Sequence, residues 1–476
     1  MQKIRTPIKC IFVNAAAKTI YDKHPVYYLA AYLKSKGVIV GYVQGSNHTK
    51  LVSEIEAIAP DLVLYSAFST DLDGYVSFDR MLKERVRVKS VIGGPGPTFD
   101  QEFLAKSTID ALCVGEGEYA LEQFIDSGLT SGNNLLFHGQ TDLTLNPLIA
   151  DLDSLPFPHR DIVYEKDPVL RDVNFKLFLT GRGCPYSCTY CYNNLYNRVF
   201  REQGKVLRQK SVNYVIAEMN ECRKKYPYEV AVFQDDTFIH NKVWLREFCE
   251  RLPKEVGVGF LCNVRANLVD EATVLMLKEG GCYGVSWSIE SGCETLRNQV
   301  LKRRMSEDQM LQAAELLNRH GLKHRIGNIF GIPGETWEDM LSTLELNIKS
   351  KPMLAIGNIF VPFKGLELTQ YALDHKFLRP DYLSRLPKNY STGSVMEISE
   401  ELNLKMQKLA LLFPVLVCFP FLYTVKWLRR VIFSLPRAIC KALGTLVYGV
   451  RMWQLYRVSS KPVTAARLFL REMGGR

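Results

Sequence analysis

The sequence predicts an α/β protein with two successive sheets of parallel strands and a helical C-terminal region. Three observations support this fold class. Apolar strands alternate with helical patterns over residues 1–130, and the same alternation returns over residues 174–388. Residues 389–476 differ in composition, being basic and rich in apolar side chains. A chain of 476 residues exceeds one ordinary hydrophobic core, so two or three domains are expected.

The first region carries strands that each end in a small or polar residue. Strand patterns lie over residues 8–13, 38–43, 61–65, 91–92 and 111–114, with helical patterns over 25–36 and 50–58. Ser66 follows the third strand, Gly93 and Gly94 follow the fourth, and Gly115 and Glu116 follow the fifth. Ligands of open α/β sheets bind outside these carboxyl ends, where small residues allow a close approach to the backbone. We therefore expect these five residues at a ligand site.

A connector separates the two predicted sheets. Residues 131–173 contain paired asparagines and several prolines, the punctuation of an extended linker. Beyond it, strand patterns start at residue 175 and recur over 230–234, 258–262, 284–288, 325–330 and 355–361. Active residues of β/α barrels lie at the carboxyl ends of such strands.

Three cysteines stand just after the first strand of the second region. Cys184, Cys188 and Cys191 have the spacing Cys-x-x-x-Cys-x-x-Cys. Three thiolates hold three irons of a four-iron cluster and leave the fourth iron open to a chelating ligand. The alternative is three structural thiols in a loop. The other nine cysteines show no paired pattern and the sequence shows no signal peptide, which indicates a reducing, cytoplasmic location.

This cysteine motif resembles that of the radical S-adenosylmethionine (SAM) enzymes. Three later segments extend the resemblance in the family's order: Ser288-Ile-Glu290-Ser-Gly292, Phe330-Gly-Ile-Pro-Gly-Glu335-Thr and Phe360-Val-Pro-Phe-Lys-Gly365. The resemblance implies an open six-stranded β/α barrel in which SAM chelates the open iron and is split into methionine and a 5′-deoxyadenosyl radical. It also implies a one-electron reductant such as flavodoxin or ferredoxin.

The resemblance assigns roles to several residues at or near strand ends. Tyr190 is expected near the adenine of SAM, and Glu290 and Gly331 are expected to contact SAM. Asp235 and Asp236 follow the second strand and are candidate catalytic residues. Because neighbouring side chains of an extended chain point to opposite faces, at most one of these two carboxylates is expected to face the site.

Arginines supply further candidates. Arg265 follows the third strand and is a candidate for a two-pronged contact with the carboxylate of SAM; the alternative is a structural ion pair with one of the two aspartates. Arg182 and Arg208 are weaker candidates for the same contact. The run Lys302-Arg303-Arg304 is interpreted as a solvated basic run on a helix or loop.

The first 130 residues resemble the cobalamin-binding Rossmann domain that precedes many radical SAM cores. Asp22 and His24 begin the family's pattern, the serine and paired glycines named above continue it, and Tyr27 stands where the pattern has glycine. A side chain at that position crowds the corrin edge or the cofactor tail. His24 is therefore expected to be a solvated or capping residue, with axial ligation of cobalt as the alternative. For the whole domain, the alternative is a nucleotide-like or degenerate Rossmann module.

The net charge of +10 belongs to the C-terminal region, since residues 401–476 carry thirteen Lys and Arg against two Glu. Residues 409–425 are uncharged but contain two prolines, which disfavour a straight membrane span. Aromatic and apolar residues mixed with cations favour peripheral helices on the inner face of the cell membrane over about residues 405–458. The alternative is a helical cap over the barrel. Nucleic-acid binding is not expected, because no recognition module accompanies the charge.

Together these features predict a cobalamin-dependent radical SAM enzyme with three cofactors: a 4Fe-4S cluster, SAM and cobalamin. The expected reaction is methyl transfer to an unactivated carbon of a small, hydrophobic or natural-product-like substrate. A radical SAM cyclase, rearrangement or oxidation enzyme using the same cofactors is the alternative within the family. A non-enzymatic cobalamin or iron–sulfur sensor is the alternative from a different functional class.

Overall fold

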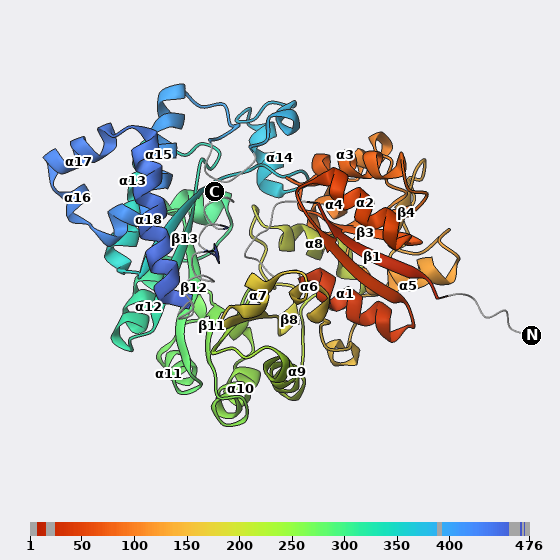
Figure 1. Ribbon diagram of the computed structural model, residues 1–476. Helices are drawn as coiled ribbons and strands as arrows, with labels where there is room; N and C mark the ends of the chain where they lie inside the picture. The colour runs from red at the N-terminus through yellow and green to blue at the C-terminus, as the bar shows by residue number, and fades with distance from the viewer. Residues whose placement is uncertain (1–6, 16–23, 388–392, 457–466, 469–470, 472–476) are drawn as a thin grey trace, which may run out of the picture. The chain divides into compact units, whose positions relative to one another are not determined.

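The computed structural model, shown in Figure 1, describes residues 7–15, 24–387, 393–456, 467–468 and 471. The chain divides into two units. The first unit contains residues up to Asp172 together with Tyr196–Arg208, and the second contains Val173–Leu195 and the chain from Gln209 onward. The connector predicted over residues 131–173 therefore falls within the first unit as far as Asp172.

A six-stranded sheet forms the centre of the first unit, with strand order β2-β1-β3-β4-β5-β6. The strands are β1 (Lys9–Asn14), β2 (Ile39–Gln44), β3 (Leu62–Ser66), β4 (Lys89–Gly93), β5 (Ala111–Cys113) and β6 (Leu135–Phe137). The five predicted strands are confirmed and run parallel, but the sheet is mixed rather than wholly parallel. Strand β6 runs antiparallel to β5 and comes from the predicted connector, where Leu135 and Leu136 are buried.

Helices cover both faces of this first sheet. Helix α2 packs beside α3, and α1 packs beside α5, and Figure 1 shows the two pairs on opposite faces. The helices of the unit are α1 (His24–Ser35), α2 (His48–Ile58), α3 (Leu72–Lys83), α4 (Pro95–Phe99), α5 (Glu118–Asp126), α6 (Asp161–Tyr164) and α7 (Pro168–Asp172). Such coverage buries both faces of the parallel strands, which explains their continuous apolar sequences.

The second unit is built on a parallel sheet with strand order β14-β13-β12-β11-β10-β7. All six predicted strands are confirmed: β7 (Phe175–Phe178), β10 (Val230–Phe233), β11 (Gly259–Asn263), β12 (Cys282–Glu290), β13 (Lys323–Phe330) and β14 (Leu354–Ile359). Two further strands, β8 (Gly181–Arg182) and β9 (Arg208–Gln209), have two residues each.

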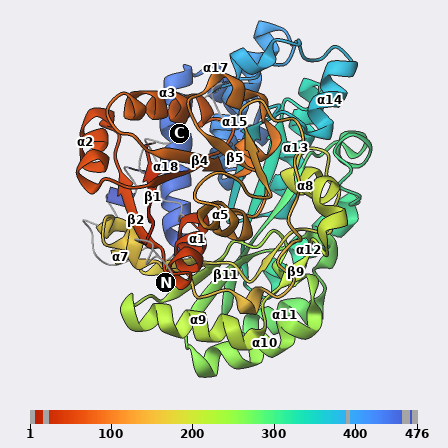
Figure 2. The same ribbon diagram turned by 90° about the vertical axis from the view of Figure 1, so that its right-hand side faces the viewer.

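Helices alternate with these strands along the chain. They are α9 (Val212–Lys225), α10 (Lys242–Glu255), α11 (Glu271–Glu279), α12 (Glu307–Arg319), α13 (Trp337–Ser350) and α14 (Glu367–Asp374), while α8 (Tyr192–Phe200) belongs to the second unit only as far as Leu195. Figures 1 and 2 show α9, α10 and α11 side by side on the outside of the sheet. Reciprocal side-chain caps fix the starts of α12, through Ser306 and Gln309, and of α13, through Thr336 and Asp339.

The C-terminal region forms the helices α15 (Glu400–Cys418), α16 (Phe421–Thr424), α17 (Lys426–Ser434) and α18 (Arg437–Tyr456). Helix α15 packs against β14 and α18, and its residues Leu409, Leu412 and Phe413 are fully buried. The ring of Tyr456, at the end of α18, lies 5.1 Å from that of Phe175 in β7. The two helices thus contact both edge strands of the sheet. Most of the uncharged run is buried in the core, because α15 packs against the edge strand β14. A cap over the barrel mouth stays a prediction.

Within the described ranges, no single helix is both long and apolar enough to cross a membrane; α17 and α18 reach that threshold only as a pair bent by 109°. Residues 457 and 458, at the end of the segment expected to meet a membrane, lie outside the described residues.

Candidate active site

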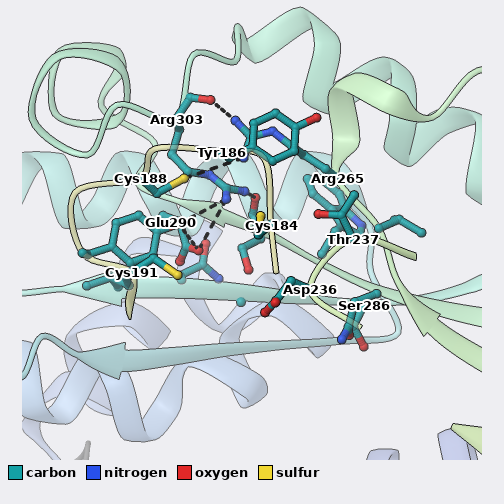
Figure 3. A pocket seen from close by; sticks show the side chains of 18 of the residues that line it. Cys184, Tyr186, Cys188, Cys191, Asp236, Thr237, Arg265, Ser286, Glu290 and Arg303 are labelled. Atoms are coloured by element: carbon teal, nitrogen blue, oxygen red, sulfur yellow. Dashed lines mark hydrogen bonds and ion pairs between the residues drawn. The ribbon is translucent and has the colours of Figure 1, made fainter. Parts of the chain in front are cut away.

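A cavity of about 440 Å³ lies at the carboxyl ends of strands β10 to β14 in the second unit. Figure 3 shows the side chains that line it, among them the three cysteines of the predicted cluster motif, Cys184, Cys188 and Cys191. The site therefore lies at the predicted end of the strands, within the second unit.

The cysteine loop runs between β8 and α8. Gly183, with φ +87°, starts the loop in a conformation that favours glycine, and the Cys191 N–H donates to the carbonyl of Cys188 at 3.2 Å. Burial raises the pKa of Cys184 and raises that of Cys191 to about 12. The free thiols are therefore protonated, and metal ligation would release their protons.

The three thiols line one cavity, and a cluster would bind each of them through a different iron. Among the described residues, no three His, Cys, Asp or Glu side chains are close enough to hold one metal ion. A four-iron cluster holds each cysteine on a different iron, so its thiolates lie farther apart than the ligands of one ion. Three cysteines that line one cavity can supply the three thiolate ligands of a 4Fe-4S cluster.

Two buried arginines give the cavity positive charge. Arg265 stacks on the ring of Tyr186 at 3.9 Å, and its Nη1 lies 3.9 Å from the Cys188 sulfur. Its Nη2 donates to the carbonyl of Arg303. Among the described residues Arg265 pairs with neither Asp235 nor Asp236, so the alternative of a structural ion pair is wrong.

Arg303 was predicted to be a solvated residue, and this prediction is wrong. Its side chain is buried and lines the cavity, donating to the Ser288 carbonyl at 2.7 Å and to the Tyr190 hydroxyl at 3.1 Å. Its neighbours Lys302 and Arg304 both have φ of +52°. The two left-handed residues turn the chain so that only the middle side chain points inward. No local sequence signal indicates this conformation.

The Nε atoms of Arg265 and Arg303 are buried and make no hydrogen bond within the described part of the chain. A buried N–H group without an acceptor is costly, and for a charged group the cost is larger. Both side chains line the cavity. Their unused donors fit an anionic ligand group such as the carboxylate of SAM.

Glu290 is held in a strained conformation at the end of β12. Its φ is +68°, and the register between β12 and β13 shifts between Ser288 and Glu290. The carboxylate lines the cavity, where it accepts from the Tyr190 hydroxyl at 2.8 Å and lies 4.0 Å from Arg303 Nη1. Burial raises the pKa of Glu290, and Arg303 and Tyr190 oppose the rise. A left-handed glutamate at a strand end is costly, and such strain clusters at functional sites.

The two aspartates after β10 occupy different environments. Asp235 is buried and accepts from the Thr180 N–H at 3.0 Å and from its hydroxyl at 2.8 Å, while burial raises the pKa of Asp235 to about 6. Asp236 lines the cavity, and burial raises its pKa as well. As expected, only one of the pair faces the site. Asp235 instead joins the ends of β7 and β10.

Gly331 does not line this cavity. It begins a turn after β13 with φ +75°, and its N–H donates to Glu335 Oε2 at 2.6 Å. The geometry of the turn accounts for this glycine, and its contact with SAM stays a prediction. Arg182 forms part of β8, outside the lining residues.

Burial of Glu335 should make the stability of the second unit depend on pH. Burial raises its pKa to about 8, although two backbone N–H groups oppose the rise, and its Oε1 has no hydrogen-bond partner among the described residues. The folded state holds this proton more tightly than the unfolded chain does. Stability should therefore fall as the pH rises from the ordinary value of 4.5 to about 8.

Glu335→Gln should remove this slope and raise stability above pH 8, because the amide carries no charge to bury. Urea unfolding across this pH range checks the expectation. Parallel pH profiles for the variant and the original protein would contradict it.

In the first unit, Ser66 and Gly93 face each other across β3 and β4 at the carboxyl ends of the strands. Gly94 has φ +106°, and a Cβ on it would lie 2.6 Å from the carbonyl oxygen of Ala67. The close approach of the chain to itself therefore requires glycine here, whether or not a corrin also approaches. A Cβ on Gly93 would make only an ordinary contact, at 3.5 Å from Cys113.

Gly94→Ala should destabilise the first unit by about 2 kcal/mol even without cobalamin, since the added Cβ meets backbone in a left-handed conformation. Gly45→Ala is the matched control, because no atom lies within 4 Å of its added Cβ. Thermal unfolding of the two cofactor-free variants measures the difference. Equal unfolding temperatures would mean that the fold does not need glycine at position 94 and that only a ligand could require it.

Gly115 and Glu116 are engaged by a segment that follows the cysteine loop in sequence. A Cβ on Gly115 would lie 2.8 Å from Cε1 of Phe200, which is fully buried. The Glu116 carboxylate accepts from Arg208 Nη1 at 3.1 Å and Nη2 at 2.7 Å, and from the Ile149 N–H at 3.1 Å. The guanidinium of Arg208, a weaker candidate for the SAM carboxylate, is thus engaged in a buried ion pair within the first unit. A cofactor contact for either residue stays a prediction.

Tyr27, the departure from the cobalamin pattern, is fully buried. Its ring lies 5.8 Å from that of Tyr164, edge to face, and 5.6 Å from the guanidinium of Arg160. The side chain thus anchors the connector within the first unit.

His24 begins α1, and Asp22 lies outside the described residues. Small residues at the ends of β3 and β4 fit cobalamin, whereas an approach as far as Gly115 requires Phe200 to move.

Comparison with known sequences agrees with this division. The profile of the Radical SAM superfamily matches residues 178–346, and that of the B12 binding domain matches residues 11–125. An uncharacterized methyltransferase of Pyrococcus horikoshii is 28% identical over 370 residues, covering 74% of this chain and 78% of that protein. Cytidylyl-2-hydroxyethylphosphonate methyltransferase of Streptomyces wedmorensis is 22% identical, covering 71% of each chain. Anaerobic magnesium-protoporphyrin IX monomethyl ester cyclase of Rubrivivax gelatinosus is 24% identical, covering 72% of this chain and 65% of that protein.

Solved structures share the fold. The radical SAM methyltransferase TsrM of Kitasatospora setae, with cobalamin and a [4Fe-4S] cluster bound, has a TM-score of 0.65 at 16% identity, covering 78% of each chain. The cobalamin-dependent SAM radical enzyme OxsB has a TM-score of 0.61 at 16% identity, covering 80% of this chain and 56% of that one.

Proposed function

Because the chain belongs to the B12-binding radical SAM enzyme family, we propose that it is a methyltransferase that acts on an unactivated carbon of a small, hydrophobic or natural-product-like molecule. Its cofactors are a 4Fe-4S cluster, SAM and cobalamin. One observation carries the proposal: a cavity with three cysteines and two under-bonded arginines occurs in the same chain as a B12-binding domain. The methyltransferases among its relatives support the reaction type.

When bound, the cluster supplies the electron that cleaves SAM, and cobalamin carries the methyl group. The chain's own residues bind and orient the cluster and SAM. Cys184, Cys188 and Cys191 are proposed as cluster ligands, and the guanidinium groups of Arg265 and Arg303 as partners of the SAM carboxylate.

Glu290 is proposed to bind the amino group or the ribose of SAM. Tyr190 and Arg303 hold its carboxylate in place from one side. The carboxylate is therefore already oriented before SAM binds, and binding does not have to order it. Asp236 is the proposed catalytic carboxylate facing the substrate side. Trp287, Val264 and Ile329 supply apolar lining, which excludes water from a reactive radical.

Cyclisation is the second candidate, because cyclases stand among the relatives as well as methyltransferases. The two reactions differ in the fate of the methyl group. In the first, the methyl carbon of SAM appears in the product. In the second, SAM is cleaved, but its methyl group is not transferred.

The test uses reconstituted protein under anaerobic conditions with cobalamin, a one-electron reductant, SAM carrying a deuterated methyl group, and a small-molecule extract of the host cells. Mass spectrometry should detect 5′-deoxyadenosine and a product containing the deuterated methyl. Deoxyadenosine with an unlabelled product would favour cyclisation or another rearrangement. Absence of both deoxyadenosine and a labelled product would contradict both reactions and favour a sensor.

A further inference from the structure

We propose that helices α16, α17 and α18 form a docking surface for an anionic lipid bilayer. We call this the tail surface and define it by its exposed apolar residues, Phe421, Trp427, Val431, Ile439, Leu446, Val450 and Trp453. The proposal is independent of the reaction assigned above, because none of these residues lines the cavity.

The tail surface exposes large apolar side chains to an unusual degree. Trp427 is 65% exposed, Leu446 59% and Trp453 57%. Single exposed apolar residues are ordinary on protein surfaces, but exposed apolar residues aligned along one side of a helix mark an interaction site. Tryptophan is also the side chain most suited to a bilayer interface, since its ring is apolar and its N–H is polar.

Helix α18 is apolar on two opposite faces. One face, with Cys440, Tyr448 and Leu455, is buried. The other carries Ile439, Leu446, Val450 and Trp453 at intervals of three, four and seven residues, and these side chains are exposed. This spacing aligns side chains along one side of a helix. A second apolar stripe therefore points away from the core and is exposed on the surface of the described chain.

The charge of the segment complements anionic lipid. Residues 419–456 contain Lys426, Arg429, Arg430, Arg437, Lys441 and Arg451 and no Asp or Glu. Cations flanking an apolar helical face are the signature of helices that lie in the headgroup region of a negatively charged bilayer. The same charges disfavour a second copy of this chain as the occupant. A two-fold interface would place the six cations against their own copies.

Packing within the unit indicates that α18 lies on the bilayer rather than across it. Gly444 approaches α15 so closely that an added Cβ would lie 3.0 Å from the carbonyl carbon of Leu411. Insertion of α18 as a span would break this contact and expose the buried residues of α15. The bend of 109° between α17 and α18 likewise suits two helices lying flat at an interface.

Vesicle flotation tests the proposal with the full-length protein. The protein should float with vesicles of phosphatidylcholine and phosphatidylglycerol but not with vesicles of phosphatidylcholine alone, and binding should weaken as salt rises. The double variant Arg430→Gln, Lys441→Gln should weaken binding by roughly fivefold for each cation removed. Lys224→Gln, Lys278→Gln removes two exposed cations elsewhere in the second unit and should bind as before.

A second pair of variants tests the apolar stripe. Leu446→Glu should abolish flotation, and Val243→Glu, at a residue that is 81% exposed on α10, should leave flotation unchanged. Circular dichroism verifies that both variants fold. Equal binding to neutral and anionic vesicles, or no loss on Leu446→Glu, would overturn the proposal. So would a monomer–dimer equilibrium that Leu446→Glu abolishes in the absence of lipid, since the tail surface would then bind a second copy.

Discussion

Replacing Cys188 by alanine should abolish both the iron–sulfur absorption of the reconstituted protein and the formation of 5′-deoxyadenosine from SAM. Cys188, Cys184 and Cys191 line one cavity, and a cluster that loses one of three ligands loses the site geometry that leaves a single iron open. Anaerobic reconstitution followed by iron analysis should give about four irons for the original protein and far fewer for the variant.

Cys282→Ala is the matched control. Cys282 is buried in the core at the start of β12, and its thiol donates to the Gly284 carbonyl at 3.2 Å. Its loss should lower stability by about 1 kcal/mol, the usual cost of a small buried group, and leave the iron content unchanged. Normal iron content and full SAM cleavage in Cys188→Ala would disprove the cluster assignment.

Arg303→Met should weaken SAM binding by about 100-fold, or roughly 3 kcal/mol, while the iron content stays normal. The variant removes one proposed partner of the SAM carboxylate and leaves Glu290 buried without its neighbouring cation. Equilibrium dialysis of SAM with the reconstituted protein measures the effect.

The loss must be separated from a general loss of stability. The double variant Arg303→Met, Glu290→Gln removes both charges and should recover stability but not SAM affinity, because both side chains are proposed contacts of SAM. Recovery of affinity in the double variant would show that Arg303 only compensates Glu290. Arg303 would then be a positioning residue rather than a ligand of SAM.

Most strands of both sheets were predictable because they are largely buried and read as short apolar runs, although β12 and β13 alternate buried residues with half-buried residues that line the cavity. The cysteine spacing and the place of Glu290 after a strand were predictable from the sequence, whereas the contact of Glu290 with SAM was expected only from the family resemblance. Arg303 was not predictable, because its burial depends on two left-handed neighbours that have no glycine to mark them. Strand β6 was missed because three apolar residues in a polar connector are too few for a periodic pattern.

The structural role of individual residues was harder to predict than their position at a strand end. Gly94 stands where a cofactor approach was expected, yet Ala67 alone demands glycine there. Glu116 stands at a strand end, yet its carboxylate is paired with Arg208 from a distant part of the sequence. In the same way, the uncharged run in α15 had the composition of a membrane segment, and only the packing against β14 shows it to be core.

The contacts of α15 and α18 with the two edge strands have a consequence for synthesis. Phe175 is synthesised 281 residues before Tyr456, so its ring lacks this partner while the intervening chain is being made. Until then β14 is an uncovered edge strand, and the apolar positions that Phe413 covers are open to other chains. The second unit should therefore fold completely only after α15 and α18 have been synthesised, and forms cut before residue 400 should need chaperones or aggregate.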